Sequence, residues 1–201
     1  MQITFLGTGD AGRVPVYGCE CKACADARVD TSRCRTATSI EVCAGENKFL
    51  IDAGQVNLPQ RYPAGSLDAI LLTHYHMDHV MGLFQLRWGE NTKLPVYGPE
   101  DEKGCDDLYK HTGILCFKPP LSAFQSFSLA GISVTPVPLQ HSRPCFGYLL
   151  EHGEQRIAYL TDTVGLGDNT VSFIGSFHPH VMIIDCTHPP THVQPRNHNN
   201  W

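Results

Sequence analysis

Short apolar segments rich in β-branched residues recur along the whole chain and predict strands. They are Ile3–Leu6, Ser39–Val42, Phe49–Ile51, Ala69–Leu72, Leu94–Tyr97, Ile132–Val137, Phe146–Leu150, Ile157–Leu160 and Val181–Ile184. The residues Glu151–Glu154, between two of these segments, are typical of a hairpin turn. Helical spacing of apolar residues is rarer and predicts helices over Cys21–Val29, Asp78–Trp88, Asp101–Lys110 and Asn169–Ile174. Many strands with interspersed helices indicate an α/β or α+β layered domain.

Composition and charge narrow the class of protein. The 201 residues are 42% hydrophobic and 17% charged, which is an ordinary globular composition and excludes a disordered chain. The net charge of −5, with no basic cluster, argues against a surface that coats nucleic acid. No basic and apolar leader is present at Met1–Gly7, and no apolar run approaches the roughly 20 residues of a membrane span. We therefore expect a soluble, cytoplasmic protein.

The densest group of polar side chains follows the predicted strand that ends near Thr73. Because side chains alternate in an extended chain, His74 and His76 should point the same way and be able to bind one ion. Asp78 and His79 open the next helix and can point at a second ion. Packing offers no reason to gather four costly polar groups at one strand end, so we predict a metal site here.

Two further candidate ligands each follow another predicted strand. His141 and Asp162 lie just beyond the carboxyl ends of their strands, where sheet-based sites usually collect ligands. Either residue alone would more often be a surface or capping residue. Together with the His74–His79 group, they form a set of imidazole and carboxylate ligands that suits Zn, Mn or Fe.

A second candidate site lies near the N-terminus, where Cys19, Cys21 and Cys24 are closely spaced. Thiolates are soft ligands, and this spacing lets three of them converge on one tetrahedral zinc ion. The alternative is three small buried residues, but a reducing compartment favours zinc. We interpret the other cysteines as ordinary thiols: Cys34, Cys43, Cys105, Cys116, Cys145 and Cys186. The acidic balance and the missing second Cys/His pair argue against a nucleic-acid-binding zinc finger.

With Leu50–Gly54 upstream and His141 and Asp162 downstream, the His74–His79 motif resembles the metallo-β-lactamase superfamily. More narrowly, the chain is similar to the PhnP family of phosphodiesterases from the carbon–phosphorus lyase pathway. The motifs that carry this similarity run nearly end to end: Gly7–Gly9, Gly18–Cys24, Thr73–His79, Gly82–Phe84, Leu86–Gly89, Pro95–Pro99, Gly104–Leu108 and Asp185–Pro190.

The resemblance implies a fold and a set of metal sites. The fold is a four-layer αββα sandwich, with residues 1–201 as a single domain and a Cys-rich zinc-binding insert at about residues 17–35. The implied cofactors are two catalytic divalent ions, Mn²⁺ or Zn²⁺, and one structural Zn²⁺. One catalytic ion is held by His74, His76 and His141, the other by Asp78 and His79, with Asp162 bridging; the structural zinc is held by Cys19, Cys21, Cys24 and a C-terminal histidine.

Asp78 and His198 are the residues to which the resemblance assigns a catalytic role. His198, in Pro195–His198, matches the histidine that donates a proton to the leaving alkoxide in the family. From the sequence alone, a tail histidine without a role is the simpler interpretation, and only the resemblance favours catalysis.

The chain departs from the family after His198, where only Asn199–Trp201 follow. The family continues through a helix and a strand that end in two further histidines, one for the second catalytic ion and one for the zinc. We therefore expect the sandwich to lack its last strand and helix elements, about 30–50 residues, and the second ion to bind loosely. His188 or His192 could substitute at the catalytic ion and Cys34 at the zinc.

The function that the resemblance implies is hydrolysis of a cyclic ribose phosphate by a phosphoric diester hydrolase. The reaction would convert 5-phosphoribosyl 1,2-cyclic phosphate to ribose 1,5-bisphosphate in phosphonate catabolism, through a metal-bound hydroxide. Two alternatives stay open: a thioesterase or lactonase-type hydrolase on the same fold, and an inactive metal-binding remnant. The expected partner is a small-molecule cyclic phosphate, without nucleic acid or membrane, and a homodimer stays open.

Overall fold

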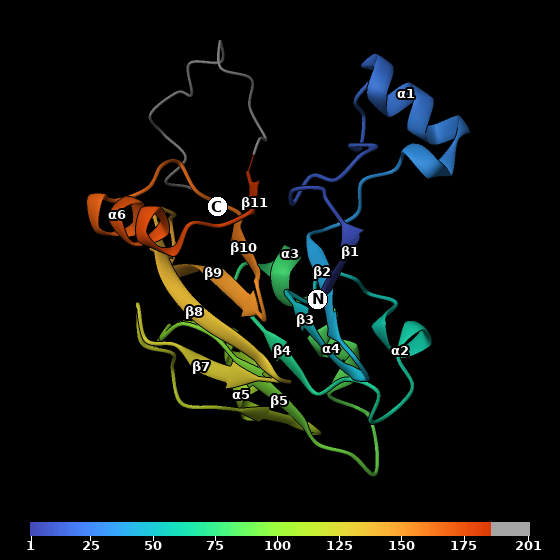
Figure 1. Cartoon of the computed structure of the whole chain (residues 1–201). Coiled ribbons are helices and arrows are strands. Elements are labelled where there is room, and N and C mark those ends of the chain that lie inside the picture. Colours follow the sequence, from blue (N-terminus) through green and yellow to red (C-terminus); the bar gives the residue numbers. More distant parts are fainter. Residues whose placement is uncertain (186–201) are drawn as a thin grey trace.

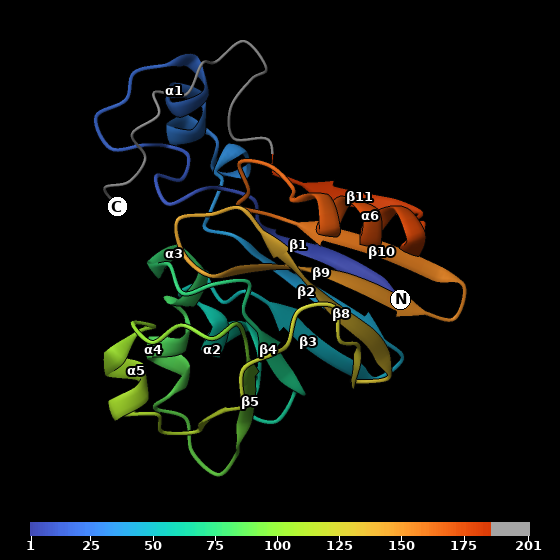
Figure 2. The same ribbon diagram turned by 90° about the vertical axis from the view of Figure 1, so that its left-hand side faces the viewer.

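In the computed structural model, which describes residues 1–185, two mixed β-sheets face each other and helices cover their outer faces (Figures 1 and 2). The first sheet has the order β1-β2-β3-β4-β5-β6. Its strands are β1 (Gln2–Gly7), β2 (Ser39–Ala44), β3 (Asn47–Ile51), β4 (Ala69–Leu71), β5 (Leu94–Tyr97) and β6 (Leu115–Phe117). The first three strands pair antiparallel, and β3 through β6 pair parallel.

The second sheet has the order β11-β10-β9-β8-β7. Its strands are β7 (Phe127–Leu129), β8 (Ile132–Leu139), β9 (Cys145–His152), β10 (Gln155–Leu160) and β11 (Val181–Ile184). All neighbours pair antiparallel except β10 and β11, which are parallel. The carboxyl ends of β4, β8 and β10, which precede the predicted ligands, are thereby brought together.

The helices are short, apart from the one on the second sheet. They are α1 (Lys22–Val29), the 3-10 turn η1 (Thr31–Arg33), α2 (Leu58–Arg61), α3 (Met77–Val80), α4 (Leu83–Leu86), α5 (Asp106–Lys110) and α6 (Asp168–Phe177). Helices α2 to α5 lie outside the first sheet and α6 lies outside the second (Figure 2). The predicted four-layer αββα architecture is confirmed.

The first sheet is buried on both faces, and side chains that alternate along each strand are divided between these faces. Leu50 and Ile70 pack under the helices of the first layer, whereas their neighbours Phe49, Ile51 and Leu71 pack between the two sheets. A sheet that is covered on both sides has nearly continuous apolar strands, which is the pattern seen in the sequence. A third apolar cluster, which includes Val137 and Ile174, joins the second sheet to α6.

The structure corrects three of the predicted helices and adds two strands. The helix predicted over Asp78–Trp88 is two helices, α3 and α4, and the helix predicted over Asp101–Lys110 forms only from Asp106. The helix predicted over Asn169–Ile174 extends to Asp168–Phe177. Strands β6 and β7 were not predicted, because three residues are too few for an alternating pattern to be recognised.

An N-terminal arm formed by α1 and η1 lies apart from the two sheets (Figures 1 and 2). It is anchored locally, since the Arg28 side chain donates to the Val16 carbonyl at 2.9 Å. That the arm is a zinc-binding insert in a single domain stays a prediction. Within residues 1–185, no helix has both the length and the apolar composition that crossing a bilayer requires.

Candidate metal centre

The centre is built first from the segment that joins β4 to α3. His74 is fully buried, and His76 precedes α3 with extended backbone angles (φ −69°, ψ 152°). The two side chains therefore project to the same side, as predicted, and His74 Nε2 lies 2.9 Å from His76 Nδ1. His141, which follows β8, places its Nε2 atom 3.0 Å from the same His76 Nδ1. Three imidazole nitrogens thus converge on one point.

A second cluster shares His74 with the first. Asp162 follows β10, and its Oδ2 atom lies 4.0 Å from His74 Nε2 and 2.6 Å from His79 Nε2. The Asp78 carboxylate is 3.6 Å from the same His79 nitrogen. Asp162 therefore lies between the group formed by His74, His76 and His141 and the pair Asp78 and His79.

Two buried residues that sequence reasoning did not assign to the site orient these histidines. Asp52, at the end of β3, accepts the Thr73 backbone N–H at 2.8 Å, and its Oδ2 atom is 2.8 Å from His79 Nδ1. The Thr73 hydroxyl lies 3.0 Å from Asp52 Oδ1 and 3.0 Å from His74 Nδ1. The signal in the sequence was an aspartate directly after a buried strand, in the segment Leu50–Gly54.

These contacts assign a tautomer to each of the two buried histidines. The Thr73 hydroxyl donates to the Asp52 carboxylate, so its oxygen is free to accept the Nδ1–H of His74. His79 donates its own Nδ1–H to Asp52. In His74, Nε2 is then the atom with a free lone pair. In His79, burial opposes the protonated form, but Asp52 and Asp162 raise the pKa of the ring well above its usual value, so a metal ion at Nε2 would take the place of a proton. A carboxylate behind a histidine is a usual support for a metal ligand.

The environment also sets the charge of the groups. Burial, reinforced by the neighbouring imidazoles, lowers the pKa of His74, which keeps this ring neutral and able to bind a metal. Burial raises the pKa of Asp52, although His79 beside it favours the ionised form. Burial also opposes the ionised form of Asp162, but the His79 ring beside it holds the pKa of Asp162 below the usual value.

Both carboxylates occupy backbone positions that are uncommon for residues other than glycine. Asp52 has φ 61° and Asp162 has φ 58°, in the left-handed region. Each such conformation costs on the order of 1 kcal/mol or more and persists where the surrounding structure imposes it, often at functional sites. Here it turns each carboxylate from the end of its strand toward the histidines.

The residues present fit a metal. The Oδ2 atom of Asp162 is buried and has no hydrogen-bond partner of acceptable geometry, despite its short contact with His79. Three imidazole nitrogens that face one another at about 3 Å have no room for a proton on each. One or more cations would satisfy all of these atoms, and the His and Asp ligand set suits a divalent ion such as Zn²⁺.

The three N-terminal cysteines also converge. The sulfur atoms of Cys19, Cys21 and Cys24 lie within 4.8 Å of one another. Cys24 is buried, and its sulfur accepts the Val16 backbone N–H at 3.3 Å. The Cys24 backbone N–H, followed by the Cys19 side chain, lowers the pKa of Cys21, which favours the thiolate that binds zinc. The eight cysteines within residues 1–185 are all free thiols.

The remaining candidates lie elsewhere. His198, His188 and His192 fall outside the described residues.

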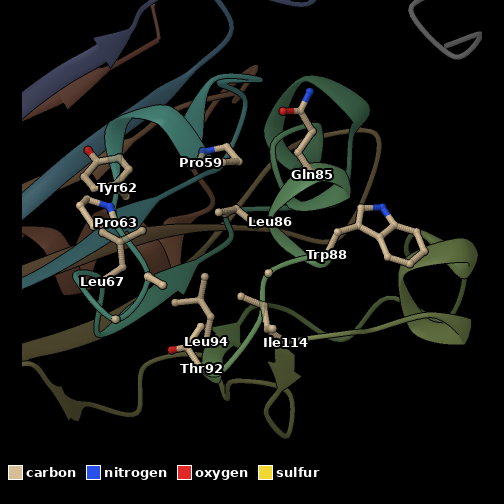
Figure 3. Close-up of a pocket in the computed structure, with 13 residues that line it drawn as sticks. Pro59, Tyr62, Pro63, Leu67, Gln85, Leu86, Trp88, Thr92, Leu94 and Ile114 are labelled. Atoms are coloured by element: carbon tan, nitrogen blue, oxygen red, sulfur yellow. The ribbon is translucent and has the colours of Figure 1, made fainter.

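An apolar cavity of about 280 Å³ opens between α2 and α4, with Tyr62 and Pro63 on one side and Gln85 and Trp88 on the other (Figure 3). Tyrosine is the only titratable residue in its lining, so the candidate chemistry belongs to the histidine and aspartate clusters.

A larger cavity of about 840 Å³ adjoins the first metal cluster. His76 lines it, together with Tyr75, Lys103, Ser142 and Arg143. Its size falls within the range of small-molecule sites, and it gives a substrate a route to the histidines.

Comparison with known proteins identifies relatives of this chain. Residues 47–198 match a family described as the β-lactamase superfamily domain. An octanoyltransferase from Porphyromonas gingivalis is 36% identical over 180 residues, which are 81% of this chain and 35% of that protein. Coenzyme PQQ synthesis protein B from Methylobacterium radiotolerans is 30% identical over 194 residues, which are 80% of this chain and 64% of that protein. The chain thus spans less than two thirds of both relatives.

A solved structure agrees with these sequence matches. The crystal structure of a new diphosphatase from the PhnP family superimposes with a TM-score of 0.71 at 26% identity, covering 86% of this chain and 68% of that one. The fold therefore has a counterpart among solved structures.

Proposed function

The chain belongs to the metallo-β-lactamase superfamily, and from this membership we propose that it is a metal-dependent hydrolase. The observation that carries the proposal is the convergence of histidine and aspartate side chains from the ends of β4, β8 and β10 on two adjoining clusters. We propose that His74, His76 and His141 hold one divalent ion, that Asp78 and His79 hold a second, and that Asp162 contacts both.

Divalent ions in such a site lower the pKa of water and neutralise negative charge that builds up on the substrate. The chain's own residues supply the rest of the chemistry. Asp52 and Thr73 accept the Nδ1–H groups of His79 and His74, which directs the Nε2 atoms of both rings toward the centre, and Asp162 places a carboxylate between the two clusters. The cavity of about 840 Å³ beside His76 admits the substrate.

For the substrate, we propose a phosphodiester, and more narrowly the cyclic phosphate of a phosphorylated ribose. The motifs shared with the PhnP family support this choice, as does the similarity to a diphosphatase of that family. Hydrolysis of a phosphodiester requires mainly positioning and electrostatic stabilisation, which such a centre supplies. We further propose that three N-terminal cysteines bind a structural zinc ion.

The proposal is tested with the purified chain and added Mn²⁺ or Zn²⁺. Hydrolysis of bis(p-nitrophenyl) phosphate and of 5-phosphoribosyl 1,2-cyclic phosphate is measured beside that of a thioester and a lactone. We expect metal-dependent turnover of the phosphodiesters, which His76→Ala abolishes and His152→Ala, at an exposed hairpin residue, leaves unchanged. Preferential turnover of the thioester or the lactone would instead assign the alternative hydrolase, and no turnover of any substrate would leave only metal binding.

His198 carries the proposed role of proton donor to the leaving group. The proposal rests on the resemblance of Pro195–His198 to the family motif. His198→Ala should lower kcat for a substrate with a poor alkoxide leaving group far more than for bis(p-nitrophenyl) phosphate, because nitrophenolate needs little protonation. His111→Ala, at an exposed histidine, is the matched control, and equal losses on both substrates for His198→Ala would contradict the assignment.

A further inference from the structure

We propose that Arg143 is a positioning residue: with Asp101 it braces the segments that carry His76 and His141 and fixes one wall of the adjoining cavity. The proposal rests on the proposed function, because its effect on turnover requires that the chain be a hydrolase. Its effect on metal affinity does not depend on any substrate, which keeps the two proposals separable.

The Arg143 guanidinium makes contacts in three directions. Its Nη1 atom donates to the Tyr75 carbonyl at 2.7 Å, and Nη2 donates to the Gly104 carbonyl at 3.3 Å. Its Nε atom lies 3.0 Å from Asp101 Oδ2, an ion-pair contact, and Nη2 donates to Asp101 Oδ1 at 3.4 Å. The Asp101 side chain is only 5% exposed, so water and salt screen this ion pair little on the carboxylate side.

The position of these contacts in the chain links the two ligand segments. Tyr75 lies between His74 and His76, so a bond to its carbonyl holds the backbone from which both ligands project. Arg143 lies two residues after His141. The guanidinium therefore joins the end of β4 to the segment after β8, and the 3.0 Å separation of His76 Nδ1 and His141 Nε2 is set across this brace.

The same contacts shape the cavity. Asp101 Oδ1 accepts the backbone N–H groups of Lys103 at 3.0 Å and Gly104 at 2.9 Å, which folds the 101–104 segment into a turn. This turn, with Arg143 itself, lines the cavity of about 840 Å³ beside His76. The Asp101 carboxylate thus stabilises the turn that forms this wall, and the Arg143 guanidinium joins the wall to the candidate metal centre.

The chemistry of arginine suits this role better than that of lysine. A planar guanidinium presents donors in fixed directions, so one side chain can reach two carbonyls and a carboxylate at the same time. A lysine ammonium in its place keeps the positive charge but cannot donate to both carbonyls and the carboxylate at the same time. Arg143→Lys should therefore retain part of the ion pair and lose only part of the brace.

The test compares Arg143→Met, Arg143→Lys and Asp101→Asn with Arg87→Met. Arg87 pairs with Asp107 at 2.6 Å and has a side chain that is 11% exposed, so it is a matched arginine–aspartate pair away from the centre. Mn²⁺ affinity is measured from the free ion's electron paramagnetic resonance signal, and kcat and KM are measured with bis(p-nitrophenyl) phosphate.

We expect Arg143→Met to weaken Mn²⁺ binding about 10-fold or more, the loss typical of an outer-shell support, and to raise KM. Arg143→Lys and Asp101→Asn should show the same changes to a smaller degree and keep the test usable if the methionine variant does not fold. Arg87→Met should lower only the thermal stability. Unchanged Mn²⁺ affinity and KM in folded Arg143 variants would overturn the brace, whereas absence of turnover in the unaltered chain would count against the proposed function alone.

Discussion

At the residue scale, the centre depends on polar side chains that are withdrawn from water. Asp52, Thr73 and His74 are fully buried, and His79 is 1% exposed. Burying such groups is costly unless each finds a partner. Here the hydroxyl of Thr73 and the carboxylate of Asp52 satisfy the Nδ1 side of both rings and leave the Nε2 atoms directed at one another and at Asp162.

A first prediction concerns Asp52, which is fully buried. Asp52→Asn removes the negative charge behind His79, so we expect Mn²⁺ affinity to fall by about 10- to 100-fold. Mn²⁺ is the suitable probe because it prefers imidazole and carboxylate to thiolate. The free ion is followed by electron paramagnetic resonance, with Asp168→Asn, at an exposed residue of α6, as the control. Equal affinity in the two variants would remove Asp52 from the account of the site.

A second prediction tests the ligands themselves. The double variant His74→Ala and His76→Ala removes two of the three nitrogens of the first cluster, and His74 also belongs to the second. We expect it to lose at least one bound Mn²⁺ per chain by elemental analysis, while zinc at the cysteines stays. The control replaces two exposed histidines, His111→Ala and His152→Ala. Unchanged stoichiometry in the first double variant would show that the ions bind elsewhere.

At the scale of elements, the break between α3 and α4 has a specific cause. The Gly82 N–H donates to the Ala53 carbonyl at 2.7 Å, and the Ala53 N–H donates to the His79 carbonyl at 2.7 Å. The loop after β3 is thereby held against the chain between the two helices. The same loop also brings Asp52 to His79. The contacts that interrupt the helix therefore also position the residue that supports a proposed ligand.

Gly82 supplies the third prediction. A Cβ atom there would lie 2.4 Å from the Gln55 carbonyl oxygen and 2.7 Å from that of Ala53, both backbone atoms. Gly82→Ala should therefore lower the free energy of unfolding by about 1–3 kcal/mol and weaken Mn²⁺ binding through α3. Gly175, inside α6, has open space around its Cβ position, so Gly175→Ala should raise that free energy by about 0.5–1 kcal/mol. Urea unfolding measures both, and shifts of the same sign would contradict the steric argument.

How far the sequence predicts the site is also decided by the elements. Strands buried on both faces are recognisable as apolar runs, and a polar cluster directly after such a run marks candidate metal ligands, so the sequence alone predicts His74 to His79 as one group. The role of Asp52 cannot be predicted without the order of the sheet. Ile51 pairs with Leu71, and only this pairing puts Asp52 beside Thr73. The contact between Arg143 and Asp101 joins segments far apart in sequence, and no local pattern predicts it.

At the scale of the whole molecule, the two candidate metal sites belong to different parts of the structure. The histidine and aspartate clusters lie where strands from both sheets end, supported by the apolar clusters between and outside the sheets. The three cysteines lie at the start of the arm formed by α1 and η1, apart from the sheets (Figure 1). Within α1, only Cys24 and Ala27 are buried. So few buried apolar residues stabilise the folded arm little, and another interaction must supply the free energy that keeps it folded.

The last prediction follows from this separation. If zinc at the cysteines supplies that free energy, Cys21→Ser should release one zinc ion per chain and lower the thermal midpoint, because structural zinc binding contributes directly to folding. Turnover per folded molecule and Mn²⁺ affinity should stay within about twofold, since the arm holds no proposed ligand of the catalytic ions. Cys116→Ser, on β6 beyond the arm, is the control and should keep its zinc. A Cys21→Ser protein that is fully folded but inactive would mean that the arm shapes the catalytic centre, and one that keeps its zinc would mean that the cysteines do not bind it.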